Sequence, residues 1–293
     1  MPETLHPFDP EDAAAIDELR AQLARGPKMR IAPAARAKFD EMSGRTPVPD
    51  GVACERGELA GVAGWWVRPG DARGDAALLY LHGGGWVIGS ATPYRGLAGQ
   101  LAVRAGAAAF VAEYALAPER PFPAAFDDAC AVFDALHARF RRVALVGDSA
   151  GGNLALAGLL ARRAAAAGAL ALSPNVDLTQ TSSPRDAQDP MLSAEVVAEG
   201  ARQYLAGHDA RDPRASPSHG DLRQLPPIWL CAGEDEVLLD PLRAFVAAVD
   251  AAGSRAELHT WRGMHHVFPS RIQLAASRAA LALAGAALRA MLR

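Results

Sequence analysis

A serine lies at the centre of a short glycine-rich segment, Gly147-Asp148-Ser149-Ala150-Gly151. The preceding residues, 143–146, are apolar with valine at both ends, which favours a strand, and residues 152–163 are rich in leucine and alanine, which favours a helix. A serine on a sharp turn between a strand and a helix has an exposed hydroxyl, and small neighbours let the chain make that turn. Ser149 is therefore predicted to be the nucleophile of a serine hydrolase.

A serine nucleophile needs a general base, and in folds with such a turn an acid and then a histidine follow the serine. Five histidines follow Ser149, namely His208, His219, His259, His265 and His266. The first two fall in a long polar stretch, and His259 falls inside the last predicted strand. His265 and His266 follow that strand, in a loop begun by Gly263. Folds with such a serine turn place their general base in this loop. Adjacent side chains point in different directions, so only one of this pair can act.

The acid that orients the base is expected just after the penultimate strand, where three acidic residues follow Gly233. Asp235 is the predicted acid and Asp240 the alternative, whereas Glu234 and Glu236 are interpreted as solvated loop charges. A carboxylate at this point would hold the imidazole in the correct tautomer and stabilise the imidazolium.

A second glycine-rich segment, His82-Gly83-Gly84-Gly85-Trp86, follows a predicted strand at 76–81. Attack on an acyl carbon develops an oxyanion that preorganised backbone amides can stabilise. We expect two of the amides of Gly83, Gly84 and Gly85, with Gly84 and Gly85 favoured, together with the amide of Ala150. His82 is expected to pin this loop by hydrogen bonds. The segment has neither the lysine nor the glycine spacing of a phosphate-binding loop.

Alternating strand and helix patterns position these residues. The predicted strands are 52–59, 64–67, 76–81, 108–114, 143–146, 169–172, 228–232 and 256–260, and the predicted helices between or after them are 92–105, 123–140, 152–163, 239–252 and 274–292. Thr92 is the expected cap of the first of these helices. The alternation indicates an α/β fold with a mostly parallel, eight-stranded sheet covered on both faces.

Two segments outside this alternation are predicted to cover the site. Residues 1–45 form an N-terminal helical segment, with helices at 11–25 and 33–42, and residues 46–293 form the catalytic domain. Within that domain, residues of about 178–225 are polar and rich in proline, with one helical segment at 194–205. Long insertions in α/β folds are commonly lids or binding loops, so both segments are interpreted as a cap.

The overall composition narrows the function classes. A net charge of −3 over 293 residues offers no basic surface for nucleic acid. Cys54, Cys130 and Cys231 are widely spaced, which argues against a disulfide framework or a zinc site and favours a reducing compartment. The acidic N-terminus lacks the apolar core of a signal peptide, and no stretch is long and apolar enough to span a membrane. We therefore expect a soluble, cytoplasmic protein without a metal or organic cofactor.

Taken together, the motifs resemble the hormone-sensitive-lipase-like group, bacterial family IV, of α/β-hydrolase esterases. The resemblance runs from about Gly51 to the C-terminus and is carried by the segments 82–86, 114–125, 147–152, 235–240 and 266–268, with further likeness at 173–178, 189–192 and 212–217. It implies the α/β-hydrolase fold with a helical cap. It also implies that Asp235 is the acid and that His266, two residues before Phe268, is the base. His265 stands where the group more often has an apolar or aromatic residue.

The predicted activity is that of a serine carboxylesterase acting on short- to medium-chain esters of small molecules through an acyl-enzyme. Trp86, Tyr204 and Phe268 are candidates to line the acyl pocket, and ordinary core aromatics are the alternative interpretation. Lactone hydrolysis or N- or O-deacetylation would use the same three catalytic residues. A ligand-binding role, as in plant gibberellin receptors that have lost the histidine, is disfavoured because His266 is present. A homodimer through the last strand and the C-terminal helix is also expected, because sheet edges invite pairing.

Overall fold

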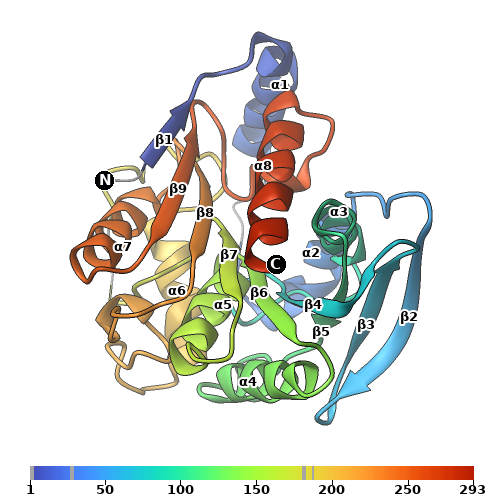
Figure 1. Cartoon of the computed structure of the whole chain (residues 1–293). Helices are drawn as coiled ribbons and strands as arrows, with labels where there is room; N and C mark the ends of the chain where they lie inside the picture. Colours follow the sequence, from blue (N-terminus) through green and yellow to red (C-terminus); the bar gives the residue numbers. More distant parts are fainter. Residues whose placement is uncertain (1–2, 27–29, 180–182, 187) are drawn as a thin grey trace.

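A computed structural model describes residues 3–26, 30–179, 183–186 and 188–293. These residues form one sheet of nine strands in the order β1-β9-β8-β7-β6-β4-β5-β3-β2 (Figure 1). The strands are β1 (Glu3–His6), β2 (Val52–Leu59), β3 (Val62–Pro69), β4 (Arg73–Leu81), β5 (Ala107–Ala112), β6 (Arg142–Asp148), β7 (Gly168–Leu172), β8 (Ile228–Gly233) and β9 (Ala256–Trp261). The pairs β2–β3 and β3–β5 are antiparallel, and all the others are parallel, so the predicted mostly parallel sheet is confirmed.

Helices cover both faces of the sheet, as the unbroken apolar runs of its central strands require. The helices are α1 (Ala13–Arg25), α2 (Arg36–Ser43), α3 (Arg95–Ala105), α4 (Ala124–His137), α5 (Ser149–Ala161), α6 (Ala194–Leu205), α7 (Leu239–Ala251) and α8 (Ala275–Met291). Helices α4, α5 and α7 pack on one face, and α3 and α8 on the other. Thr92 does not cap α3, whose first turn follows Tyr94; its hydroxyl instead accepts a hydrogen bond from the Trp65 indole.

The ninth strand changes one edge of the predicted sheet. β1 pairs in parallel with β9, in register from Glu3 opposite Leu258 to His6 opposite Trp261. The expectation that the last strand lies at a sheet edge is therefore wrong, because the N-terminal residues cover it. The homodimer stays a prediction, and β1 is the strand that would lie at its interface.

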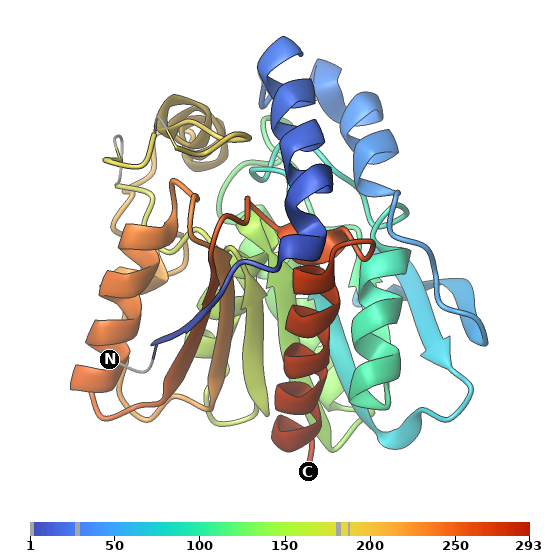
Figure 2. The same cartoon turned by 90° about the horizontal axis from the view of Figure 1, so that it is seen from above.

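Three helices lie beyond one end of the sheet, where the carboxyl ends of the central strands meet (Figure 2). These are α1 and α2 from the N-terminal segment and α6 from the insertion, whose bounds coincide with the predicted 194–205. The insertion also contacts the N-terminal segment, since the Gln203 amide on α6 donates to the carbonyl of Ile31, between α1 and α2, at 2.6 Å. The N-terminal segment is joined to the main domain by Asp12, whose carboxylate accepts the amides of Ala275 and Ala276 at the start of α8.

Candidate active site

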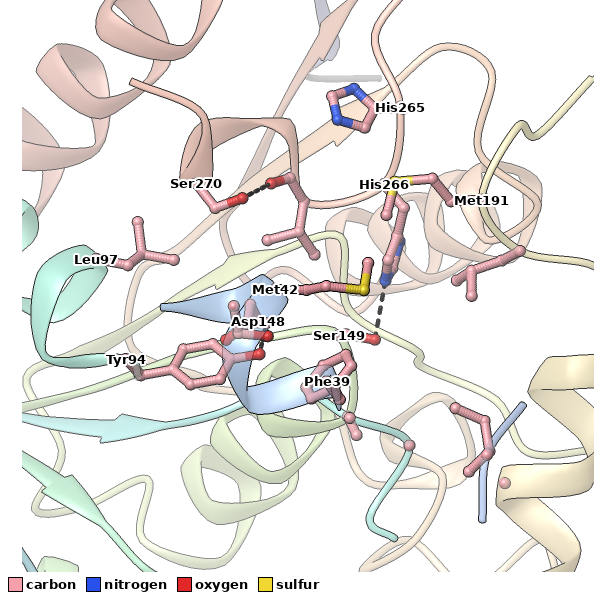
Figure 3. Close-up of a pocket in the computed structure, with 18 of the residues that line it drawn as sticks. Phe39, Met42, Tyr94, Leu97, Asp148, Ser149, Met191, His265, His266 and Ser270 are labelled. Atoms are coloured by element: carbon pink, nitrogen blue, oxygen red, sulfur yellow. Dashed lines mark hydrogen bonds between the residues drawn. The ribbon is translucent and has the colours of Figure 1, made fainter. Parts of the chain in front are cut away.

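Ser149 occupies a strained turn between β6 and α5. Its φ is +52°, in the left-handed region that a side chain other than glycine rarely adopts. Gly151 makes the turn possible, because a Cβ there would lie 2.0 Å from the carbonyl oxygen of Leu81. The turn directs the serine hydroxyl into a pocket at the strand ends (Figure 3).

His266 contacts this hydroxyl. Its Nε2 lies 2.9 Å from Ser149 Oγ, and its Nδ1 lies 2.9 Å from a carboxylate oxygen of Glu236. An ionised carboxylate can only accept, so Nδ1 carries the proton and Nε2 is free to accept from the serine hydroxyl. The geometry is therefore that of a nucleophile, a general base and an orienting acid.

The acid beside His266 is not the predicted one. Asp235 is partly exposed and forms an ion pair with Arg20 of α1, 2.6 Å from the guanidinium. Glu236 is fully buried and makes the contact that was expected of Asp235. The alternative, Asp240, pairs with Arg185. The interpretation of Glu236 as a solvated loop charge is thus wrong.

One local signal distinguishes Glu236 from its acidic neighbours. It immediately precedes the apolar run Val237-Leu238-Leu239, which is buried, so Glu236 lies at the point where the chain turns inward. The resemblance to the family implies Asp235, one residue earlier. A shift of one residue at a turn is enough to send one carboxylate to the surface and the other into the site.

Ser173 holds Glu236 and the histidine loop together. Its hydroxyl donates to one Glu236 carboxylate oxygen at 2.7 Å and accepts the amide of Val267 at 3.0 Å. The amide of Gly233 donates to the same carboxylate oxygen. The second oxygen of Glu236 is thereby left to His266, whose orientation follows from this network.

Opposing effects act on the pKa of His266. Burial disfavours the charged imidazolium, but the hydrogen bond and negative charge of Glu236 favour it, with smaller contributions from Asp189 and Asp148. The net result is a pKa raised above the ordinary value of 6.5. A raised pKa makes the imidazole a better acceptor of the Ser149 proton, as a general base requires.

The other histidines have different surroundings. His265 is buried and accepts from Arg271, and His259 stacks between Trp229 and His6. His82 hydrogen-bonds the carbonyl of Gly83 and stacks on Tyr114, consistent with a role in pinning the loop, and burial lowers its pKa to about 4. Of the pair left open by the residues alone, His266 is the one that touches Ser149.

The glycine loop after β4 is Gly83-Gly84-Gly85, and two of these three glycines line the pocket. Gly84, Gly85 and Ala150 line the pocket with Ser149. Over the described part of the chain, their amides donate to no protein acceptor, as expected of groups kept for an oxyanion. Gly83 differs, because its amide donates to Asp148 at 3.0 Å. Its inclusion among the candidate donors is therefore wrong.

Comparison with known proteins shows the family of the chain. Residues 78–270 match the family model described as the alpha/beta hydrolase fold. An acetyl-hydrolase of Streptomyces hygroscopicus is 40% identical over 86% of this chain and 87% of its own length, and an esterase of Acinetobacter venetianus is 31% identical over 85% and 86%. The crystal structure of an esterase from the bacterial hormone-sensitive lipase family superposes with a TM-score of 0.89 at 36% identity, covering 98% of this chain and 99% of that one.

The chain belongs to the α/β-hydrolase family. Its relatives and structural neighbours place it with the bacterial hormone-sensitive-lipase-like esterases, as the sequence motifs indicated. In this hydrolase the buried Asp148 supports the glycine loop. Its carboxylate accepts hydrogen bonds from the hydroxyls of Tyr80 and Tyr94 and from the amide of Gly83. Burial raises the pKa of Asp148 to about 6 although these hydrogen bonds act in the opposite direction.

The pocket of this α/β hydrolase is small and mainly apolar. Its volume is about 240 Å³, just below the range of roughly 300–1,000 Å³ that suits drug-sized ligands. Trp86 lines it, as expected. Tyr204 and Phe268 do not; Tyr204 is buried between Trp86 and Phe122, and Phe268 packs on Trp261. Both are core aromatics. Phe39 and Met42 of α2, Leu97 of α3 and Met191 of the insertion supply apolar surface instead (Figure 3).

Proposed function

We propose that this protein is a serine carboxylesterase in which Ser149, His266 and Glu236 form the catalytic triad. Relatives of this chain are named esterase, carboxylesterase and ethyl acetate hydrolase, which are names of enzymes that cleave carboxylic esters. The observation that carries the mechanism is the chain of two 2.9 Å contacts, from Ser149 Oγ to His266 and from His266 to Glu236.

The reaction follows from these contacts. Ser149 Oγ attacks the ester carbonyl carbon while His266 Nε2 takes the hydroxyl proton, and Glu236 stabilises the resulting imidazolium. The amides of Gly84, Gly85 and Ala150 stabilise the oxyanion of the tetrahedral intermediate. His266 then gives its proton to the leaving alcohol, and water attacks the acyl-enzyme by the same route, with release of the acid and restoration of Ser149.

The proposed substrates are short- to medium-chain esters of small molecules. A cavity of about 240 Å³ supports this, since it leaves little room for a long acyl chain and an alcohol together. The relative named acetyl-hydrolase supports the short end of the range and also favours a second candidate, removal of an acetyl group from a metabolite oxygen or nitrogen. Ester and amide cleavage share the tetrahedral intermediate, so one triad serves both.

A series of p-nitrophenyl esters from acetate to palmitate tests the proposal, with Ser149→Ala measured in parallel. We expect kcat/KM to be highest at short or medium chain length and to be essentially lost in a folded Ser149→Ala variant. Full activity in that variant would contradict the mechanism. Faster turnover of palmitate than of butyrate would contradict the substrate range.

The proposal includes a cytoplasmic location, which the sequence predicted from its cysteine usage. In the structure Cys54, Cys130 and Cys231 are free thiols. In the described residues, no helix is long and apolar enough to cross a bilayer.

A further inference from the structure

Two arginines, Arg45 and Arg271, line the pocket that contains Ser149. Arg45 follows α2, and Arg271 lies in the loop that leads to α8. These two segments are joined where the Thr46 hydroxyl donates to the carbonyl of Ser270 at 2.5 Å. Figure 3 shows Ser270 in this wall of the pocket. Both guanidinium groups therefore belong to one wall, contributed by the cap and by the main domain together.

Neither arginine has an acidic partner among the described residues. Arg271 makes one hydrogen bond, from Nε to His265 Nε2 at 3.0 Å, and its Nη1 and Nη2 groups donate to no described acceptor. Arg45 makes no hydrogen bond within the same set of residues. Burial and the neighbouring charge of Arg45 lower the pKa of Arg271, so the two cations disfavour each other.

His265 is suited to holding Arg271 in this state. Burial, together with the charge of Arg271, lowers the pKa of His265 to about 3. The ring therefore stays neutral, and its Nε2 can accept a hydrogen bond from Arg271 Nε. This contact fixes one edge of the guanidinium and leaves the two Nη groups available. A planar guanidinium with both Nη groups free matches the two oxygens of a carboxylate.

Three arginines of the N-terminal segment and the insertion are paired with acids, unlike Arg45 and Arg271. Arg20 binds Asp235, Arg36 binds Glu119, and Arg185 binds Asp240. Among the described residues that line the pocket, the one carboxylate is Asp148, and its oxygens already accept three hydrogen bonds. Arg45 is exposed, whereas Arg271 is partly buried and its Nη groups have no described acceptor. An anion in the pocket would therefore gain charge-assisted hydrogen bonds from Arg271 and the favourable charge of Arg45.

We propose that Arg271 and Arg45 bind a carboxylate of the substrate, so that the preferred ester carries a carboxylate group away from the bond that is cleaved. This inference rests on the proposed esterase function and adds the substrate class to it. Hydrolysis of such an ester consumes one water and yields a second carboxylate and an alcohol, without any other reactant.

Matched pairs of esters test the inference, because a carboxamide has nearly the shape of a carboxylate but no charge. Monoethyl glutarate and its carboxamide analogue place the group on the acyl side, and 4-acetoxybutanoate and its carboxamide place it on the alcohol side. Acid release is followed by titration at constant pH. For at least one pair we expect kcat/KM to be about 10- to 100-fold higher for the carboxylate, the usual effect of a charge-assisted hydrogen bond.

Variants of Arg271 and Arg45 test whether these residues cause the preference for a carboxylate. Arg271→Gln and Arg45→Gln are expected to lower the carboxylate-to-carboxamide ratio about tenfold or more, and Arg271→Lys to retain part of it because the charge remains. The ratio is taken within one variant, so a general loss of folded protein cancels. Arg262→Gln is the matched control, since Arg262 is exposed and outside the pocket, and its ratio should equal that of the wild type.

The outcomes separate this inference from the proposed function. Wild-type protein that hydrolyses p-nitrophenyl butyrate but shows no carboxylate preference in either pair overturns the inference and leaves the esterase standing. A preference that survives in both Arg271→Gln and Arg45→Gln also overturns it. Protein that hydrolyses no ester contradicts the proposed function itself. A preference that is lost in these variants and weakened by about 500 mM salt supports the inference.

Discussion

Replacing Glu236 with glutamine removes the negative charge beside His266 while keeping the shape of the side chain. Glutamine can still accept from Ser173 through its carbonyl oxygen, so the local packing is retained. Its amide group would face His266 Nδ1 and favour the tautomer in which Nε2 carries the proton. Nε2 in that form cannot take the proton of Ser149.

The magnitude follows from the geometry of the pair. An imidazolium and a carboxylate about 4 Å apart between charge centres interact by about 4 kcal/mol at an effective dielectric constant of about 20. Because each ~1.4 kcal/mol corresponds to a factor of ten in rate, losing this term costs about 10³-fold, and the unfavourable tautomer adds up to another factor of ten. We therefore expect kcat/KM of Glu236→Gln to fall about 10³- to 10⁴-fold.

Asp235→Asn is the matched control for this change. Asp235 is the adjacent acid, and its partner Arg20 is about half exposed, at 46% of its side chain. Exposed ion pairs contribute about 0–1 kcal/mol to stability, so kcat/KM should remain within about threefold of the wild type. Both variants are measured with p-nitrophenyl butyrate, and thermal unfolding confirms that they are folded. A 10³-fold loss in Asp235→Asn, with near-normal activity in Glu236→Gln, would refute the assignment of the acid.

Three further outcomes are expected. The raised pKa of His266 means that kcat/KM falls as the pH is lowered through a midpoint above 6.5, and a pH profile of kcat/KM with a midpoint clearly below 6.5 would contradict this. Gly84→Ala places a Cβ 2.1 Å from the carbonyl oxygen of Ile88, at a φ of +123°, so kcat should fall about 100-fold or more through displacement of the oxyanion loop; unchanged kcat would count against that loop. Ser173→Ala removes one donor to Glu236, and steady-state kinetics should show kcat reduced about 10-fold with KM little changed, whereas an increase in KM alone would argue for a different role.

Much of the site could be predicted from the sequence because its parts are local in the chain. The turn at Ser149 needs a strand, small residues and a helix in succession, and each leaves a pattern within a few residues. Gly84 and Gly85 likewise follow a recognisable buried strand. The helix at 194–205 was also predictable, since its apolar positions recur with helical spacing.

Other features depended on distant parts of the chain. The sequence predicted the fold, Ser149, the glycine loop and the pair His265-His266, because strand-helix alternation and short motifs encode them directly. The resemblance to the family selected His266 from that pair. Only the tertiary structure decided which of three adjacent acids is buried beside His266, because that depends on how the chain turns after β8 and on Arg20, 215 residues earlier, binding Asp235. It also decided that β1 covers β9, that Tyr204 and Phe268 are core residues, and that Arg45 and Arg271 line one pocket. Each of these results from packing between segments far apart in the sequence. Apart from the apolar run that follows Glu236, such contacts leave no periodic or local pattern in either segment alone.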